Sequence, residues 1–212
     1  FKPTKKTKYA HRSFDIAKDS YVIGMISALD PRKGHELFIQ AANYVQHYRD
    51  NIHFLIIGDC PNHQSLYKEE LKTLVSKFKL NTQVTFTGYQ DNIPKLLNSI
   101  DIIIQPSHTD AGPLVPLESM SCGIPVIATD VGGNPEEVVH GYTGLIIPMN
   151  NPDFLGQSII NLIDDPDLRV KMRNNGRKWV KTKFDSQLLT GTIESIYDEL
   201  LQNNTTGKQL KC

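Results

Sequence analysis

The chain has 212 residues, a length that suits one domain with a sizeable buried core. Its 23 Lys and Arg residues balance its 23 Asp and Glu residues, so the formal net charge is zero. Nucleic-acid-binding domains usually carry a basic excess on one face, and we therefore expect no nucleic-acid partner. The basic residues near the start of the chain are expected to form a solvated arm: Lys2, Lys5, Lys6, Lys8 and Arg12.

Cysteine usage and hydropathy indicate the compartment. Cys60, Cys122 and Cys212 are too few and too scattered for a disulfide framework, which fits a reducing compartment. The sequence has no signal-peptide-like segment and no run of about 20 apolar residues that could span a membrane. We expect a soluble, cytoplasmic protein, associated at most peripherally with the inner face of a membrane. Because the first residue is Phe1 rather than Met, we also expect a fragment of a longer chain.

Hydrophobic patterning predicts alternating strands and helices. Residues 1–20 are polar and basic without periodicity, and we expect no structural element there. Apolar, β-forming runs typical of buried strands follow at 21–29, 52–57, 84–87, 102–104, 125–129 and 144–147. Amphipathic patterns predict helices at 35–48, 65–80, 93–99, 113–122, 152–164, 166–181 and 185–202. This alternation predicts a doubly wound, Rossmann-like parallel α/β sheet, in which ligands bind beyond the carboxyl ends of the strands.

The fingerprints of dinucleotide and nucleoside-triphosphate binding are missing. The loop after the first expected strand, 27–34, reads SALDPRKG and lacks Gly-x-Gly-x-x-Gly. Gly132-Gly133 come too late in the chain to supply that motif, and no Gly-x-x-x-x-Gly-Lys-Ser/Thr segment occurs. Both NAD and P-loop chemistry are therefore disfavoured.

Two loops contain the groups of an anion site. Arg32 and Lys33 follow the first expected strand, where a cation can reach a bound phosphate, although a solvated turn is the alternative interpretation. Gly112, Pro113 and Leu114 open the helix after the fourth strand, with Pro113 expected at the first helical position. The backbone N–H groups of such a helix start bind anions. The two loops would converge on one diphosphate if their strands are neighbours.

Polar side chains near this helix start are further candidates. Glu118 lies in an otherwise apolar helix, and its two carboxylate oxygens could bind both hydroxyls of a ribose, unless it is simply solvated. Asp110 could equally cap the helix or form the turn. His108 could donate to an oxyanion, or lie on the surface. No histidines have metal-ligand spacing, and we expect neither a metal nor a cofactor.

The segment 107–148 resembles the nucleotide-binding half of group 1 retaining glycosyltransferases of the GT-B fold, which carry a Glu-x7-Glu motif. The matching residues are Pro106-Ser107, Asp110-Ala111-Gly112-Pro113, Glu118-Ser119-Met120-Ser121, Gly123 and Pro125-Val126-Ile127-Ala128-Thr129. They continue with Gly132-Gly133-Asn134-Pro135-Glu136 and Gly141-Tyr142-Thr143-Gly144-Leu145. Upstream, 27–34 resembles the family's phosphate loop, and Phe86-Thr87-Gly88 its strand end beside the nucleotide base.

The resemblance implies the C-terminal, donor-binding half of an enzyme that transfers a sugar with retained configuration. Its substrate would be a UDP-, GDP- or ADP-sugar, used without a metal, and its partner would be an N-terminal acceptor-binding domain of the same protein. Residues 1–20 would then continue an interdomain linker, 21–202 would form the donor domain and 203–212 a polar tail. Two alternatives are a non-catalytic nucleotide-sugar-binding module and a GT-B epimerase or phosphorylase, whose signatures are not found.

Carried over by position, Lys33 would hold the diphosphate, Glu118 the ribose and Asp110 the sugar hydroxyls; these are the expected catalytic residues. The expected donor-binding residues are Ser27, Ala28, Arg32, Gly88, His108, Gly112, Pro113 and Leu114. Two positions depart from the family pattern. Ala28 replaces a phosphate-binding arginine, for which Arg32 could substitute, and Asp110 replaces a glutamate with a reach longer by about 1–1.5 Å.

Overall fold

The structure, a computed structural model, describes residues 1–3, 7–60 and 66–205. Its centre is a six-stranded parallel sheet of order β3-β2-β1-β4-β5-β6. The strands are β1 Tyr21–Ile26, β2 Ile52–Ile57, β3 Val84–Gly88, β4 Ile102–Gln105, β5 Val126–Thr129 and β6 Gly144–Ile147. The predicted doubly wound α/β class is confirmed, and a strand is present in each predicted segment, with ends that differ by at most three residues.

Helices connect the strands and end the chain. They are α1 Tyr9–Ser13, the 3-10 turn η1 Pro31–Lys33, α2 His35–Val45, α3 Leu66–Lys77, α4 Ile93–Leu97, α5 Leu114–Ser121, α6 Asn134–Glu137, α7 Pro152–Asp164, α8 Pro166–Lys183 and α9 Ser186–Thr205. The predicted helices are present, with ends that differ by a few residues. The sequence prediction omitted α1, η1 and α6, which are too short to show a hydrophobic period.

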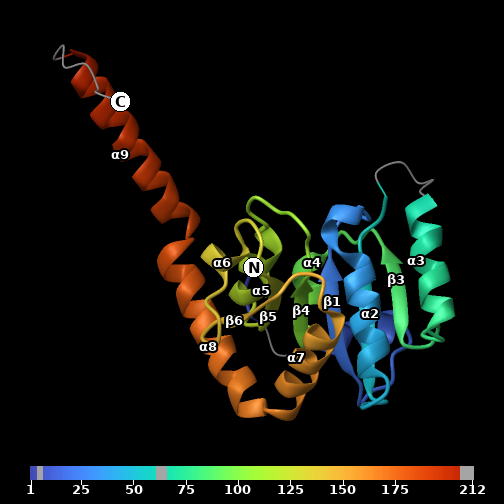
Figure 1. Cartoon of the computed structure of the whole chain (residues 1–212). Coiled ribbons are helices and arrows are strands. Elements are labelled where there is room, and N and C mark those ends of the chain that lie inside the picture. Colours follow the sequence, from blue (N-terminus) through green and yellow to red (C-terminus); the bar gives the residue numbers. More distant parts are fainter. Residues whose placement is uncertain (4–6, 61–65, 206–212) are drawn as a thin grey trace.

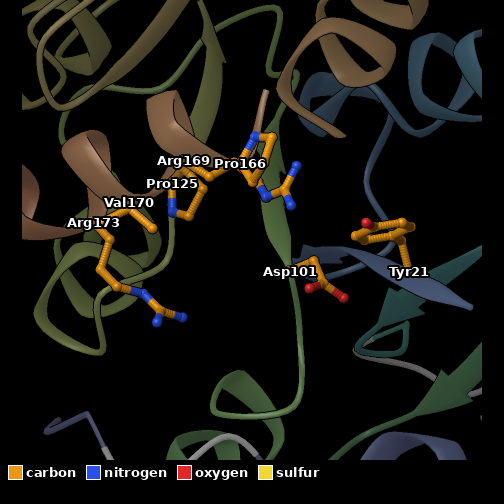
Figure 2. Close-up of a pocket in the computed structure, with 7 residues that line it drawn as sticks. All are labelled: Tyr21, Asp101, Pro125, Pro166, Arg169, Val170 and Arg173. Carbon is orange, nitrogen blue, oxygen red and sulfur yellow. The ribbon is translucent and has the colours of Figure 1, made fainter. Parts of the chain in front are cut away.

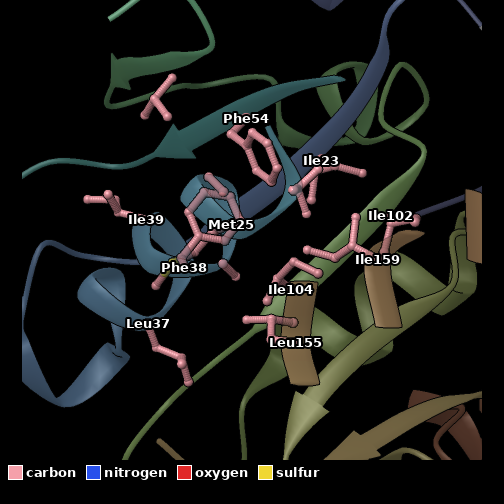
Figure 3. Close-up of a cluster of buried hydrophobic side chains, with 14 of the residues drawn as sticks. Ile23, Met25, Leu37, Phe38, Ile39, Phe54, Ile102, Ile104, Leu155 and Ile159 are labelled. Atoms are coloured by element: carbon pink, nitrogen blue, oxygen red, sulfur yellow. The ribbon is translucent and has the colours of Figure 1, made fainter. Parts of the chain in front are cut away.

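Two hydrophobic clusters sandwich the sheet, because successive strand residues point to opposite faces. On one face, Ile23, Met25 and Phe54 pack with residues of α2 and α7, as Figure 3 shows. On the other face, Val22 and Leu55 pack with residues of α1, α4, α5 and α8. The strand residues are apolar on both sides because helices cover both faces of a parallel sheet.

The prediction that 1–20 contains no structural element is wrong. Helix α1 lies in this segment, and its Ala10 is fully buried. The backbone N–H of Ala10 donates to the Ser99 Oγ at 3.2 Å, and Ile16 is only 6% exposed. Tertiary contacts, rather than a local periodic pattern, therefore order this segment.

The prediction that the first strand continues to residue 29 is also wrong. β1 ends at Ile26, and Asp30 then caps the η1 turn by accepting from the Arg32 backbone N–H. Leu29 is only 4% exposed, so its apolar character reflects burial under the loop rather than strand pairing. The expected polar tail, 203–212, falls mostly outside the described residues, and its first residues, up to Thr205, belong to α9.

Helix α9 extends away from the body of the domain, as Figure 1 shows. Its large apolar side chains are exposed to solvent: Leu188, Leu189, Ile193, Ile196, Tyr197, Leu200 and Leu201. In the described part of the chain, no helix combines the length and apolar character needed to cross a bilayer.

Candidate functional site

The strand order brings together the two loops that the sequence singled out. β1 pairs directly with β4, in parallel, with Ile23 opposite Ile102. Strands β2 and β3 are added on one side of β1, and strands β4, β5 and β6 on the other. This is the topological switch point of the sheet, where ligands of doubly wound folds bind. The condition for the two loops to converge, that the strands before Lys33 and Pro113 are neighbours, is therefore met, and their convergence on one diphosphate stays a prediction.

The loops after β1 and β4 touch through their backbones. The His108 N–H donates to the Arg32 carbonyl oxygen at 2.8 Å. Gly34 has a φ of 78°, and a Cβ at this position would lie 1.9 Å from the carbonyl oxygen of Pro106. Only glycine permits so close an approach, so the turn that carries Lys33 is fixed against the β4 loop.

Lys33 and Asp110 meet across this junction. The Lys33 Nζ lies 2.6 Å from the Asp110 Oδ2, and their side chains are 30% and 12% exposed. The same oxygen accepts from the Gln105 Nε2 at 3.2 Å and lies 3.4 Å from the Ser107 Oγ, and both of these residues are buried. The carboxylate of Asp110 is therefore oriented by several donors, and it forms an ion pair with the ammonium of Lys33.

A third loop, after β5, holds the backbone of Asp110. The Gly133 N–H donates to the Asp110 carbonyl oxygen at 3.0 Å. A Cβ at Gly132, whose φ is 50°, would lie 1.7 Å from that oxygen. A Cβ at Gly133 would lie 2.6 Å from the Ala111 oxygen. Glycines at 132 and 133 are thus needed for the β5 loop to contact the β4 loop at Asp110 and Ala111. The sequence motif alone did not reveal this contact.

The start of α5 faces open space beside this junction. Pro113 is the N-cap rather than the first helical residue, which corrects the prediction by one position, and no side chain caps the helix. Leu114 is 68% exposed, and a Cβ at Gly112 would meet nothing within 4 Å. The backbone N–H groups of the first turn of a helix lack intrahelical partners, so this end can receive an anion.

Glu118 lies one helical turn after Leu114 on α5. Its side chain is half-buried, and burial raises the pKa of its carboxyl group above the ordinary value. No described side chain donates a hydrogen bond to it. A carboxylate without a protein donor beside an anion-binding helix start is suited to a ligand that carries hydroxyl groups.

The remaining residues of the β1 loop have partners or lie on the surface. The Ser27 Oγ lies 3.1 Å from the Nε2 of His35, a fully buried residue that the sequence prediction missed. Burial lowers the pKa of His35 to about 4. Ala28 is exposed, so no described side chain occupies the place of the family's arginine.

Arg32 is engaged elsewhere in this structure. Its Nη2 lies 2.7 Å from the Asp30 Oδ2, and its side chain is 71% exposed. This hydrogen bond lowers the pKa of Asp30 to about 2. Substitution of Arg32 for the absent arginine stays a prediction, and it would require Arg32 to give up Asp30.

Gly88 ends β3 at the same edge of the sheet but at some distance from Lys33, because β2 lies between β3 and β1. Its carbonyl oxygen accepts from the Gly58 N–H at 3.0 Å. A Cβ at Gly58 would lie 2.0 Å from the Ser27 oxygen. Gly88 therefore lies at the carboxyl end of the same sheet as the other loops. It is on one side of the β1 loop, which contains Ser27, and Asp110 is on the other side.

A different pocket, of about 240 Å³, lies at the opposite edge of the sheet, where residues begin strands rather than follow them (Figure 2). Tyr21 opens β1 and Asp101 precedes β4. The guanidinium of Arg169 lies 5.4 Å from the Tyr21 ring centre, and its Nη1 donates to the carbonyls that end α7. Arg169 thus caps the C-terminal end of α7. This pocket is separate from the site between the β1 and β4 loops.

The described residues contain no group of three or more His, Cys, Asp or Glu side chains placed to hold a metal ion. The positive charge at the site comes from Lys33 and the α5 start. Whether the reaction proceeds without a metal stays a prediction.

Comparison with known proteins identifies the family. The sequence profile of the family described as "Glycosyl transferases group 1" matches residues 7–179. The chain belongs to this family. One relative, the N-acetyl-alpha-D-glucosaminyl L-malate synthase of Bacillus anthracis, is 32% identical over 154 residues, which are 73% of this chain and 39% of the relative.

Solved structures share the fold of this chain. Anabaena Alr3699/HepE, in complex with UDP and glucose, superposes with a TM-score of 0.83 at 25% identity, over 89% of this chain and 50% of that one. The C-terminal domain of the family protein LpcC from Francisella tularensis superposes with a TM-score of 0.79 at 28% identity, over 88% of this chain and 96% of that domain. The GT-B, Rossmann-like assignment is therefore confirmed.

The chain spans about half the length of the curated relatives it matches. Its extent agrees with the C-terminal domain of these glycosyltransferases, as the almost complete match to the isolated LpcC domain indicates. The family assignment rests on most of the chain, because the family profile matches residues 7–179.

Proposed function

We propose that this chain is the donor-binding half of a glycosyltransferase that transfers a sugar from a nucleotide-diphosphate sugar with retained anomeric configuration. The observation that supports this most strongly is the adjacency of β1 and β4, with Lys33 in contact with Asp110 in the loop that leads to the uncapped start of α5. Glu118 follows one turn into the same helix. The β1 loop and α5 thus contribute a cation, a helix N-terminus and a carboxylate, which are groups that can bind the diphosphate and the ribose of a sugar nucleotide.

Each group has a role that its chemistry supports. Lys33 and the N–H groups at Gly112–Leu114 would neutralise the diphosphate, which becomes more negative as the sugar–phosphate bond breaks. Glu118 would accept hydrogen bonds from the ribose hydroxyls, and Asp110 from hydroxyls of the sugar. Ser27, Ala28 and Gly88 would line the nucleotide through backbone contacts, and His108 would donate to the sugar or the phosphate.

The proposed site supplies positive charge without a metal ion. A phosphate at a helix start is held by backbone N–H groups and the helix dipole, and Lys33 adds a full charge. We therefore propose that donor binding needs neither a metal nor another cofactor. A chelator such as EDTA should leave the affinity for a nucleotide sugar unchanged, and a loss of affinity would contradict this.

The acceptor would be bound by an N-terminal half of the same protein, packed against α9. The apolar stripe of α9, defined by Leu189, Ile193, Ile196, Tyr197 and Leu200, is exposed in this chain. On a helix, these residues cover a face wider than a simple coiled-coil seam, which suits packing against a globular body rather than a second copy of α9. The relatives have the additional length that such a body requires. Any membrane association would also belong to that half.

The α9 contact can be tested in the full-length parent protein. Ile193→Glu together with Ile196→Glu should weaken the association of separately produced halves. The same changes should leave the thermal stability of this chain alone nearly unchanged, because both side chains are exposed. Undiminished association of the halves would exclude the stripe as the contact surface.

A non-catalytic nucleotide-sugar-binding module is the second candidate. It is favoured by the exposed Ala28 and by Arg32, which is bonded to Asp30 rather than directed at the site. Sugar transfer by the full-length parent protein would exclude it.

Donor binding itself can be tested with this chain. A thermal-shift panel should include UDP-glucose, GDP-mannose and ADP-glucose, because a ligand that binds only the folded state raises the melting temperature. We expect one base to be preferred. No stabilisation by any of the three at millimolar concentration would contradict the proposed function.

A further inference from the structure

Glu137 is a buried carboxylate that the family resemblance gave no role. It ends α6 and is only 6% exposed, and its Oε2 has no hydrogen-bond partner. No ion pair joins it to any described cation. Burial of a charge without a partner is unfavourable, so burial raises the pKa of Glu137 to about 7, with further contributions from Asp110 and Glu136.

The backbone of Glu137 is tied to the site. Its N–H donates to the Gly133 carbonyl at 3.2 Å, and the Gly133 N–H donates to the Asp110 carbonyl at 3.0 Å. On the other side, the Trp179 Nε1 of α8 donates to the Glu137 carbonyl at 2.9 Å. The backbone of Glu137 is therefore held between the Asp110 loop and α8, while its side chain is only 6% exposed.

A proton on Glu137 would supply a donor where one is missing. Asn134, one turn earlier on α6, is fully buried, and its Oδ1 also has no partner. Its Nδ2 donates to the Thr129 carbonyl at 2.9 Å, which fixes the amide. Two buried acceptor atoms thus occupy one helical turn, and a protonated carboxyl group is both a donor and an acceptor.

The charges around Glu137 change when a diphosphate binds. Asp110, from the β4 loop, and Glu136, on α6, both oppose its ionisation. Of the neighbouring helices, α5 carries Glu118, and α8 carries Lys183, whose Nζ lies 5.9 Å from the centre of the Trp179 ring. In the structure, the Lys33 ammonium lies 2.6 Å from the Asp110 carboxylate and balances its negative charge. A diphosphate would share that ammonium and add negative charge, so ionised Glu137 would become less favourable.

We propose that Glu137 is a positioning residue that takes up a proton when the diphosphate of a nucleotide sugar binds, and that the protonated form holds the turn 130–133 against Asp110. This inference rests on the proposed donor binding. A nucleotide sugar is a diphosphate diester and exchanges no proton of its own near neutral pH, so proton uptake on binding reports on the protein.

The test is calorimetry of the chain with UDP-glucose, GDP-mannose or ADP-glucose at about pH 7.5, in buffers of low and high ionisation enthalpy such as PIPES and imidazole. The difference between buffers gives the number of protons taken up. We expect about 0.3–1 proton for the native chain and close to none for Glu137→Gln. Glu199→Gln removes an exposed carboxylate on α9 and is the matched control, with the native proton number expected.

The pH profile is an independent measure. The dissociation constant of the native chain should rise about threefold or more between about pH 6.5 and 8.5, whereas that of Glu137→Gln should stay flat. A merely structural glutamate would give parallel profiles. Equal proton uptake by the native chain and Glu137→Gln would overturn the proposal.

A second variant covers the case in which Glu137→Gln does not fold. Asp110→Asn removes the nearby charge that opposes ionisation of Glu137, so its proton uptake should be smaller than native, and unchanged uptake would overturn the proposal. Binding without the expected proton uptake overturns this inference alone. Absence of binding by all three sugar nucleotides overturns the donor proposal, and the proton coupling with it.

Discussion

The Nζ of Lys33 lies 2.6 Å from the Oδ2 of Asp110, although the two residues are 77 positions apart in the chain. The family resemblance implies that the lysine holds the donor diphosphate and that the aspartate binds the donor sugar. In the structure each is the partner of the other. A donor diphosphate that binds Lys33, as we propose, would have to compete with Asp110 for the ammonium or share it, so the pair would influence the affinity.

Asp110→Asn should tighten the binding of UDP or GDP alone. The substitution frees the Lys33 ammonium for the phosphates and removes a negative charge, an effect of about 0.5–1.4 kcal/mol for a partly exposed pair, or about two- to tenfold in dissociation constant. Calorimetry with the free nucleotides measures it, and Asp130→Asn, at an exposed position, is the control. Weaker nucleotide binding would show that Asp110 orients Lys33 rather than competing for it.

Glu118→Ala should weaken nucleotide binding by about 1.5–3 kcal/mol, roughly ten- to hundredfold, because it removes charged hydrogen bonds to the ribose. Glu194→Ala on the exposed face of α9 is the control and should bind like the native chain. Titration calorimetry with UDP and GDP measures the dissociation constants of both variants. An unchanged affinity in Glu118→Ala would refute the ribose role.

Ala28→Arg should strengthen diphosphate binding. Ala28 is exposed, so an arginine can be placed there without a steric cost to the core, and it would restore the cation of the family's phosphate loop. We expect about three- to tenfold tighter binding, and little change for Ala28→Gln, which has a polar side chain without the charge. Flat or weaker binding of Ala28→Arg would show that this loop does not contact the phosphates.

Glu137→Gln should stabilise the fold at high pH. Burial raises the pKa of Glu137 from an ordinary value of 4.5 to about 7. Between these values the folded state binds more protons than the unfolded state, so the native free energy of unfolding falls as pH rises. Glu137→Gln cannot ionise at this position, so its free energy of unfolding does not fall in this way. At about pH 8 it should exceed that of the native chain by about 1–3 kcal/mol, and at about pH 5 the difference should be much smaller.

Urea unfolding at both pH values measures this difference. His35 and His53, whose pKa values burial lowers to about 4, titrate in both proteins, so their contribution cancels when the two are compared. A pH-independent difference between the native chain and Glu137→Gln would indicate that Glu137 keeps its ordinary pKa.

The sequence by itself determined the class of fold and the identity of the site loops. Strand and helix periods are local, and turn residues such as Asp30-Pro31 and Gly123 mark where elements end. The residues of the phosphate loop and of the α5 start could therefore be named before their positions were known. Short elements such as α1 and α6 escaped prediction because a few residues show no period.

Only the tertiary structure decided which of these groups meet. The adjacency of β1 and β4 depends on the strand order, which no local pattern specifies, and it creates the contact between Lys33 and Asp110. Burial of Glu137 and the close approach of Gly132 to Asp110 likewise arise from loops far apart in sequence. Charge and hydrogen-bonding capacity are properties of a residue, whereas pairing, competition and a shifted pKa are properties of its neighbours in space.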